Sequence, residues 1–210
     1  MTTSREEPSP LSPPPRPLFV VLSGLSGAGK DAVLAGLRLS DLPLFISVSA
    51  TTRPRRAGEK DGFDYHFVSR ARFQELIDSG ELLEWANVYS NLYGIPKEPV
   101  RQALKNGKDV IVKIDVQGAA TIKKILPGAV FIFMVTPYME ELEKRLKQRR
   151  TENSTDLERR LKAAAEELRQ MPMFDYIVVN RPGEINQAVA DIISIIKAEK
   201  CRVAQRELSF

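Results

Sequence analysis

The stretch LFVVLSGLSGAGKD, residues 18–31, decides the fold class of this chain. Residues 18–22 are an uninterrupted apolar run, which is typical of a strand buried on both faces of a parallel sheet. Gly24, Gly29 and Lys30 then match the phosphate-loop pattern, in which backbone N–H groups and a helix N-terminus surround phosphate oxygens. A glycine-rich turn without a ligand is the alternative, but the lysine supplies the charge that phosphates require. The stretch predicts a nucleotide-binding loop between a buried strand and a helix.

The rest of the chain alternates apolar runs with helical patterns. Further apolar runs lie at 45–49, 110–114, 130–135 and 176–179, and apolar residues recur at helical spacing within 31–39, 138–146 and 185–196. Strands that alternate with helices form parallel sheets, because each crossover packs a helix onto a face of the sheet. We therefore predict an α/β fold with a mostly parallel, doubly wound sheet.

Two segments interrupt this alternation. Residues 50–98 contain a strand pattern at 65–68, a helix pattern at 71–78 after Ser69, and an extended pattern at 82–88, so we predict an inserted α+β lobe there. The polar segment at about 149–156 has no apolar stripe and is predicted to be a mobile lid.

These segments divide the chain into a core and its additions. We predict a domain over 18–200, whose core comprises 18–49 and 99–200, with a disordered proline-rich tail at 1–17 and a C-terminal tail at 201–210.

Composition excludes several classes of site and partner. The chain has one cysteine and one histidine, which exclude an intrachain disulfide, a thiolate metal cluster and a multi-histidine metal site. The net charge of +4 comes with two arginine clusters, at 53–56 and 145–160, rather than a basic stripe with interleaved aromatic residues, as expected for phosphate ligands rather than for nucleic acid. No apolar run is long enough to span a bilayer and the N-terminus lacks a signal core, so we expect a cytoplasmic protein.

Several sequence blocks that follow the loop resemble the guanylate kinase family. They are SVSATTRPRRAGE at 47–59, DGFDYHFV at 61–68, LEWA at 83–86, NLYG at 91–94 and IDVQGA at 114–119, and the resemblance extends over 18–197. It implies a P-loop kinase fold with a GMP-binding lobe and a lid. It also implies an ATP:GMP phosphotransferase that makes ADP and GDP in purine nucleotide recycling, with Mg²⁺ accompanying ATP and with GMP or dGMP as acceptor.

The motif and the resemblance together give the expected site residues. For ATP they are Gly24, Leu25, Ser26, Gly27, Ala28, Gly29, Lys30, Asp31 and Asn180; for GMP they are Ser49, Arg53, Arg56, Tyr65, Glu84, Tyr93 and Asp115; for catalysis they are Lys30, Arg53, Arg149 and Arg160. A carboxylate at Glu84 can accept hydrogen bonds from both guanine N1–H and the exocyclic amine, which adenine cannot offer. Arginine forks suit phosphate oxygens, and lid arginines would neutralise the transferring group.

The arginines and the histidine also have other readings. Residues 53–56 would also suit a solvated basic loop, and Arg149 and Arg160 would also suit an exposed helix face with charge pairs. His66 is interpreted as a packing or hydrogen-bonding residue, because an ionised GMP phosphate needs no general base.

Three positions depart from the family pattern. Asp31 stands where a hydroxyl that binds Mg²⁺ is usual, Lys113 stands where Asp or Glu is usual, and Ile95 stands where Ser or Thr is usual. Because the first two changes have opposite charge, we predict that Asp31 and Lys113 form a compensating pair within about 6 Å. Asp31 also remains a candidate metal ligand.

The same departures leave other functions open. A guanylate-kinase-like binding module with weak or no turnover is the main alternative to the enzyme, because Asp31 and Lys113 fall in the predicted phosphate and metal network. A kinase for another nucleoside monophosphate is a third alternative, which Ser49 and Glu84 disfavour.

Overall fold

The computed structural model describes residues 16–88, 90–148 and 154–208. At its centre is a five-stranded parallel sheet in the order β2-β7-β1-β8-β9. The strands are β1 (Phe19–Gly24), β2 (Leu44–Ile46), β7 (Asp109–Lys113), β8 (Val130–Val135) and β9 (Tyr176–Val179). β1 is the middle strand and is buried throughout. The predicted α/β class and the doubly buried first strand are confirmed.

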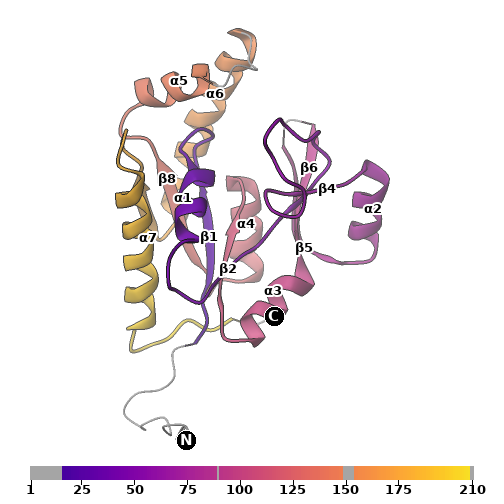
Figure 1. Ribbon diagram of the computed structural model, residues 1–210, viewed down its shortest axis with the longest axis vertical. Coiled ribbons are helices and arrows are strands. Elements are labelled where there is room, and N and C mark those ends of the chain that lie inside the picture. The colour runs from indigo at the N-terminus through magenta and orange to yellow at the C-terminus, as the bar shows by residue number, and fades with distance from the viewer. Residues whose placement is uncertain (1–15, 89, 149–153, 209–210) are drawn as a thin grey trace, which may run out of the picture.

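Alternate residues of β1 point into two separate cores, one on each face of the sheet. Val20 and Leu22 pack with α1 (Lys30–Leu37) and α7 (Ile185–Lys200), which contact each other. Phe19 and Val21 pack with residues of two other helices, α3 (Lys97–Lys105) and α4 (Val116–Ile125). The period-two alternation of a strand thus places helices on both sides of the sheet (Figure 1). In the described residues, no helix combines the length and apolarity needed to cross a membrane.

A second, four-stranded sheet stands beside the core, in the order β4-β3-β6-β5 (Figure 1). Its strands are β3 (Ala50–Thr51), β4 (His66–Phe67), β5 (Leu82–Val88) and β6 (Asn91–Pro96). Helix α2 (Arg70–Asp78) begins after Ser69, whose hydroxyl accepts a hydrogen bond from the Arg72 N–H at 3.1 Å. Phe73 of α2 packs with Ala50 and Leu82 in a small core of its own. The elements within 50–98 therefore form a mixed α+β unit, which includes an antiparallel β5–β6 pair.

The remaining helices follow β8. They are α5 (Met139–Gln148), α6 (Ser154–Arg169) and the short 3-10 helix η1 (Met171–Met173). The first part of the predicted lid, 149–153, lies outside the described residues, and α6 begins at Ser154. Of the predicted N-terminal tail, 1–15 lie outside the described residues.

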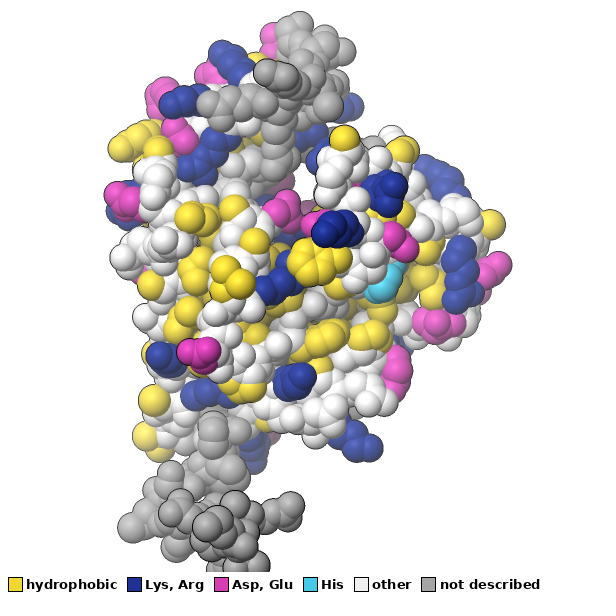
Figure 2. All heavy atoms as spheres, viewed as in Figure 1, with side chains coloured by type: hydrophobic (Ala, Val, Ile, Leu, Met, Phe, Trp, Pro, Cys, Tyr) yellow, Lys and Arg dark blue, Asp and Glu magenta, His cyan; other side chains and the backbone are white. Residues whose placement is uncertain are grey.

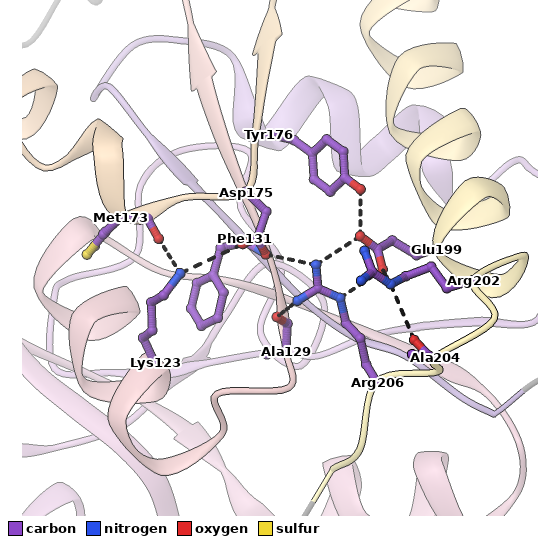
Figure 3. A network of polar contacts seen from close by, with 10 residues as sticks. All are labelled: Lys123, Ala129, Phe131, Met173, Asp175, Tyr176, Glu199, Arg202, Ala204 and Arg206. Carbon is purple, nitrogen blue, oxygen red and sulfur yellow. Dashed lines mark hydrogen bonds and ion pairs between the residues drawn. The ribbon is translucent and has the colours of Figure 1, made fainter.

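The chain after α7 returns to the core through Arg206 (Figure 3). Its guanidinium contacts Glu199 at 2.8 and 2.9 Å, donates to the Ala129 carbonyl at 2.8 Å and lies 3.3 Å from Asp175. The Glu199 side chain is fully buried and also accepts a hydrogen bond from the Tyr176 hydroxyl at 2.5 Å. Residues of the predicted C-terminal tail are thus packed onto the core by a buried ion pair.

Replacing Arg206 with methionine is expected to lower the free energy of unfolding by about 3 kcal/mol, because it removes the cation that lies 2.8 Å from a buried carboxylate and leaves only the more distant Arg202. The hydrogen bond from Arg206 is the largest cause that holds the pKa of Glu199 below its usual range. The decrease in the free energy of unfolding should therefore be smaller at low pH, because Glu199 becomes protonated and no longer needs a cation. Guanidinium unfolding at pH 7 and pH 4 measures both effects. Arg202→Met is the matched control, because Arg202 is half exposed and 3.7 Å from the same carboxylate; equal losses in the two variants would contradict the prediction.

Candidate active site

The predicted phosphate loop joins the carboxyl end of β1 to the first turn of α1. Gly24 and Gly29 adopt positive φ angles of 123° and 93°. A side chain at Gly24 would bring its Cβ within 2.1 Å of the Met134 carbonyl, and one at Gly29 would bring it within 2.3 Å of the Asn180 amide. Both glycines are therefore required by conformation and by close approach.

The loop is supported from behind by polar side chains. The Asn180 amide donates to the Ala28 carbonyl at 2.7 Å, and Arg145 donates to the same carbonyl at 3.3 Å. Lys30 Nζ donates to the carbonyls of Gly24 and Leu25 at 2.7 and 3.0 Å. Asn180 is thus buried behind the loop, where it holds backbone, rather than lining the cleft in front of it.

A cleft between the loop and the second sheet brings most of the predicted residues together. Figure 2 shows acidic and basic side chains meeting in this hollow between the core and the lobe. The predicted residues that line it are Gly24, Ser26, Gly27, Gly29, Lys30, Asp31, Ser49, Arg53, Arg56, Tyr65, Glu84, Tyr93, Asp115 and Arg160. Leu25 and Ala28, which belong to the loop, have buried side chains and do not line the cleft. Arg149 lies outside the described residues. His66 is exposed on β4 and does not line the cleft.

Arg53 is held in the cleft by a carboxylate that sequence reasoning gave no role. Glu59 accepts two hydrogen bonds from its guanidinium, at 2.7 and 3.0 Å, and one from the Arg56 N–H at 2.7 Å. Burial alone would raise the pKa of Glu59, but Arg53 and Arg56 lower it overall. The Arg53 side chain is 11% exposed, which excludes a solvated loop for this arginine.

The rings of Tyr65 and Tyr93 complete this side of the cleft. Their centroids are 5.9 Å apart in an edge arrangement, and the Arg53 guanidinium lies 5.4 Å from the Tyr65 centroid. Two tyrosines and an arginine thus form one packed cluster at the mouth of the lobe.

Glu84 is a buried carboxylate on β5 that points into the cleft. It is 5% exposed, and within the part of the chain that the structure describes its Oε1 has no hydrogen-bond partner. Burial, together with the charge of Asp115, raises the pKa of Glu84 to about 8. Helix α4 has Gly118 opposite this carboxylate, where a Cβ would lie 2.7 Å from Oε1. Asp115 caps the same helix by accepting a hydrogen bond from the Gly118 N–H at 2.7 Å.

Helix α6 brings Arg160 and Glu167 to the loop side of the cleft. The Glu167 carboxylate accepts a hydrogen bond from the Ser26 N–H at 3.1 Å, so it occupies one of the loop amides. Burial raises the pKa of Glu167, while Lys30 and the Ser26 N–H oppose that shift. Sequence reasoning missed Glu167.

Comparison with known proteins shows which family this chain belongs to. The family model for guanylate kinase matches residues 16–199. The chain belongs to the guanylate kinase family. It is 45% identical over 201 residues to guanylate kinase 2, chloroplastic/mitochondrial, of Oryza sativa subsp. japonica, covering 95% of this chain and 70% of the rice protein.

Two other relatives match a more even share of both chains. The guanylate kinase of Caldanaerobacter subterraneus is 46% identical over 186 residues, with 89% of each chain covered. The crystal structure of guanylate kinase from Anaplasma phagocytophilum superposes with a TM-score of 0.74 at 33% identity, covering 90% of this chain and 88% of that one. The P-loop kinase fold predicted from the sequence is confirmed.

The two charge departures from the guanylate kinase pattern meet in the cleft. Lys113 Nζ lies 2.5 Å from Asp31 Oδ1, which confirms the predicted pair. The Lys113 side chain is 14% exposed, whereas that of Asp31 is 72% exposed. Ile95, the third departure, is fully buried with Val100 and Ala103 in the core of the sheet face that α3 and α4 cover.

Proposed function

We propose that this protein transfers the γ-phosphoryl group of ATP to GMP and releases ADP and GDP. The observation that carries the proposal is that one cleft has the phosphate loop on one side and the buried Glu84 carboxyl group on the other, with an Oε1 that no described residue hydrogen-bonds. The first binds the phosphates of a donor and the second selects the base of an acceptor. Membership of the guanylate kinase family supports both assignments. A single cysteine, which excludes an intrachain disulfide, supports a location in the cytoplasm.

On the donor side, the N–H groups of the loop and the start of α1 bind the ATP phosphates. Ser26, Gly27 and Gly29 line the cleft in front of the helix N-terminus, where partial positive charge favours anions. Lys30 then moves from the loop carbonyls to the β- and γ-phosphates. Asn180 contributes by holding the Ala28 carbonyl, and thereby the shape of the loop.

On the acceptor side, Arg53, Arg56, Tyr65 and Tyr93 hold the GMP phosphate through guanidinium and phenol donors. Because Glu59 already orients Arg53, little conformational freedom is lost when the phosphate arrives.

The guanine base lies against β5 and α4. The Glu84 carboxylate accepts from N1–H and the exocyclic amine, and Ser49 and Asp115 line the same cleft. Adenine would leave the buried carboxylate facing an acceptor, which is the physical basis of discrimination.

Transfer requires position and charge rather than a base. The GMP phosphate oxygen is already ionised, so in-line attack needs only a short distance to the γ-phosphorus. Lys30 and Arg160 neutralise the charge that spreads over the equatorial oxygens, and Arg149 is proposed to join them from the lid.

The cleft fits a Mg²⁺ ion that is carried mainly by the nucleotide. Asp31 offers an exposed carboxylate at the start of α1, the ligand chemistry that Mg²⁺ prefers. Over the described ranges no group of three or more His, Cys, Asp or Glu forms a metal cage. When bound, the ion would supply positive charge that lowers the repulsion among the phosphate oxygens.

An acceptor panel tests the proposal. ADP release is measured with GMP, dGMP, AMP, CMP and UMP, with and without Mg²⁺. We expect turnover with GMP and dGMP, at least about 100-fold weaker turnover with the other acceptors, and dependence on Mg²⁺. Binding of GMP by calorimetry without any turnover would instead favour the binding module.

Removing the Glu167 carboxylate is expected to strengthen ATP binding. Because that carboxylate accepts the Ser26 N–H, Glu167→Ala should lower the Kd for ATP by about tenfold, the lower value for one such hydrogen bond to a charged group. Calorimetry with ATP measures it. The matched control is Glu166→Ala, since Glu166 is an exposed neighbour that pairs with Arg169. An unchanged Kd in the Glu167 variant would contradict the prediction.

A further inference from the structure

Lys113 occupies a position between the donor and acceptor halves of the cleft. It is the last residue of β7, and its partner in the sheet register is Leu22 of β1, just before the phosphate loop. Its side chain is largely buried yet lines the cleft. An ammonium group in such a place needs partners, because burying an unpaired charge is costly.

The two partners of Lys113 come from different halves of the molecule. On the donor side, Asp31 at the start of α1 lies 2.5 Å from Nζ. On the acceptor side, Nζ lies 4.4 Å from the ring centroid of Tyr65, within the range of a cation–π contact. Burial alone would lower the pKa of Lys113, but Tyr65 and Asp31 raise it overall, so the ammonium stays charged.

The contact with Tyr65 continues into the cluster that is proposed to hold the GMP phosphate. The Tyr65 ring is packed against Tyr93 and lies 5.4 Å from the Arg53 guanidinium. Polar and aromatic contacts thus run without interruption from Asp31 through Lys113 and Tyr65 to Arg53.

We propose that Lys113 is a positioning residue for the acceptor, which fixes the Tyr65 ring so that its hydroxyl and Arg53 face the GMP phosphate. The proposal rests on the proposed function and adds a residue to it. Asp31 in turn holds the ammonium in place. Lys113 acts through Tyr65, so its removal weakens GMP binding more than ATP binding.

Calorimetric binding of each nucleotide tests this assignment without turnover. Lys113→Met is expected to raise the Kd for GMP by about tenfold and to change the Kd for ATP by less than about threefold. Lys113→Arg should restore GMP binding to within about threefold, because a guanidinium can both pair with Asp31 and stack on the ring. Tyr65→Phe tests the path, because the Lys113→Met effect should be smaller in that background if it acts through the tyrosine.

The matched control is Lys108→Met, at the exposed residue just before β7. Thermal unfolding is followed for every variant. If Lys113→Met does not fold, Asp31→Asn takes its place: it leaves the lysine and removes the carboxylate that orients it. A loss of GMP affinity of about threefold or more supports the proposal, and unchanged affinity overturns it.

The outcomes separate this proposal from the proposed function. If the unaltered protein does not bind GMP, the proposed function fails. If it binds GMP and the folded Lys113→Met variant binds equally well, only the role of Lys113 is overturned. Equal weakening of GMP and ATP that arginine does not rescue would mean a general structural role and would also overturn the proposal.

Discussion

Replacement of Lys30 with methionine is expected to lower kcat for ATP and GMP by about 1000-fold, the effect of removing a charge aimed at a transferring phosphoryl group. The lysine lines the cleft at the start of α1, directly after the glycines of the phosphate loop. The Kd for GMP should change by less than about threefold, because the acceptor is held by other side chains. Steady-state kinetics and GMP calorimetry measure the two effects.

The control for this prediction must separate charge from loop shape. Lys30 also donates to the carbonyls of Gly24 and Leu25, so its loss could deform the empty loop. Lys30→Arg keeps the charge but is too large for the same two carbonyls, and we expect it to remain at least about 30-fold impaired. Lys105→Met, at an exposed lysine of α3, controls for the loss of one positive charge. Near-normal turnover in Lys30→Met would contradict a role for the phosphate loop in the transfer.

The loop and the strands could be predicted from the sequence because their signals are local. The apolar run of β1, the glycines after it and the spacing to Lys30 lie within residues 18–31. Even the contact between Asp31 and Lys113, 82 residues apart, could be predicted, because the two positions depart from the family pattern with opposite charge. Local patterns and compensating changes are the signals that survive in a single sequence.

Other contacts could not be predicted, because the sequence around a charged residue on a helix or loop does not indicate which residue it will contact. Glu167 reaches Ser26 across 141 residues from a helix rich in similar glutamates. Arg206 lies in a segment without apolar periodicity, yet it pairs with the fully buried Glu199. The hydrogen bond from the Asn180 amide to the Ala28 carbonyl is a further example, since the residue type alone does not fix where an amide points.

The second large effect concerns Glu84, whose replacement by glutamine is expected to lower kcat/KM for GMP by about 100-fold. A glutamine carbonyl can accept from only one of the two guanine donors, and its NH₂ group then faces the other donor. The side chain has nearly the same size, so the space opposite Gly118 remains filled. The ratio of GMP to AMP turnover should fall by a similar factor, as the acceptor panel measures. Unchanged selectivity would mean that Glu84 does not read the base.

The pH dependence of GMP binding follows from the raised pKa of Glu84. In the empty cleft this pKa is about 8, so near pH 6 the carboxyl carries a proton that guanine binding must displace. The Kd for GMP should therefore fall by up to about tenfold for each pH unit between 6 and 8. The GMP phosphate also titrates near pH 6, and this titration affects GMP binding to the parent protein and to the Glu84→Gln variant alike. The ratio of the Kd of the parent to the Kd of the variant, measured across pH, therefore reports the titration of Glu84 alone.

The same burial must appear as a cost in stability, which gives an independent check on the pH argument. The pKa of Glu84 is about 8 in the folded chain and has an ordinary value near 4.3 in the unfolded chain. Between these two pH values the folded state therefore binds more protons than the unfolded state. Stability then falls as pH rises from about 4.3 to about 8, by a contribution on the order of 5 kcal/mol that is complete above pH 8. Glu84→Gln should remove that loss, so urea unfolding should find the variant more stable than the parent at pH 9 but not at pH 5. If the difference is equal at the two pH values, Glu84 is not a buried, protonated carboxyl in the empty cleft, and the predicted pH dependence of GMP binding fails with it.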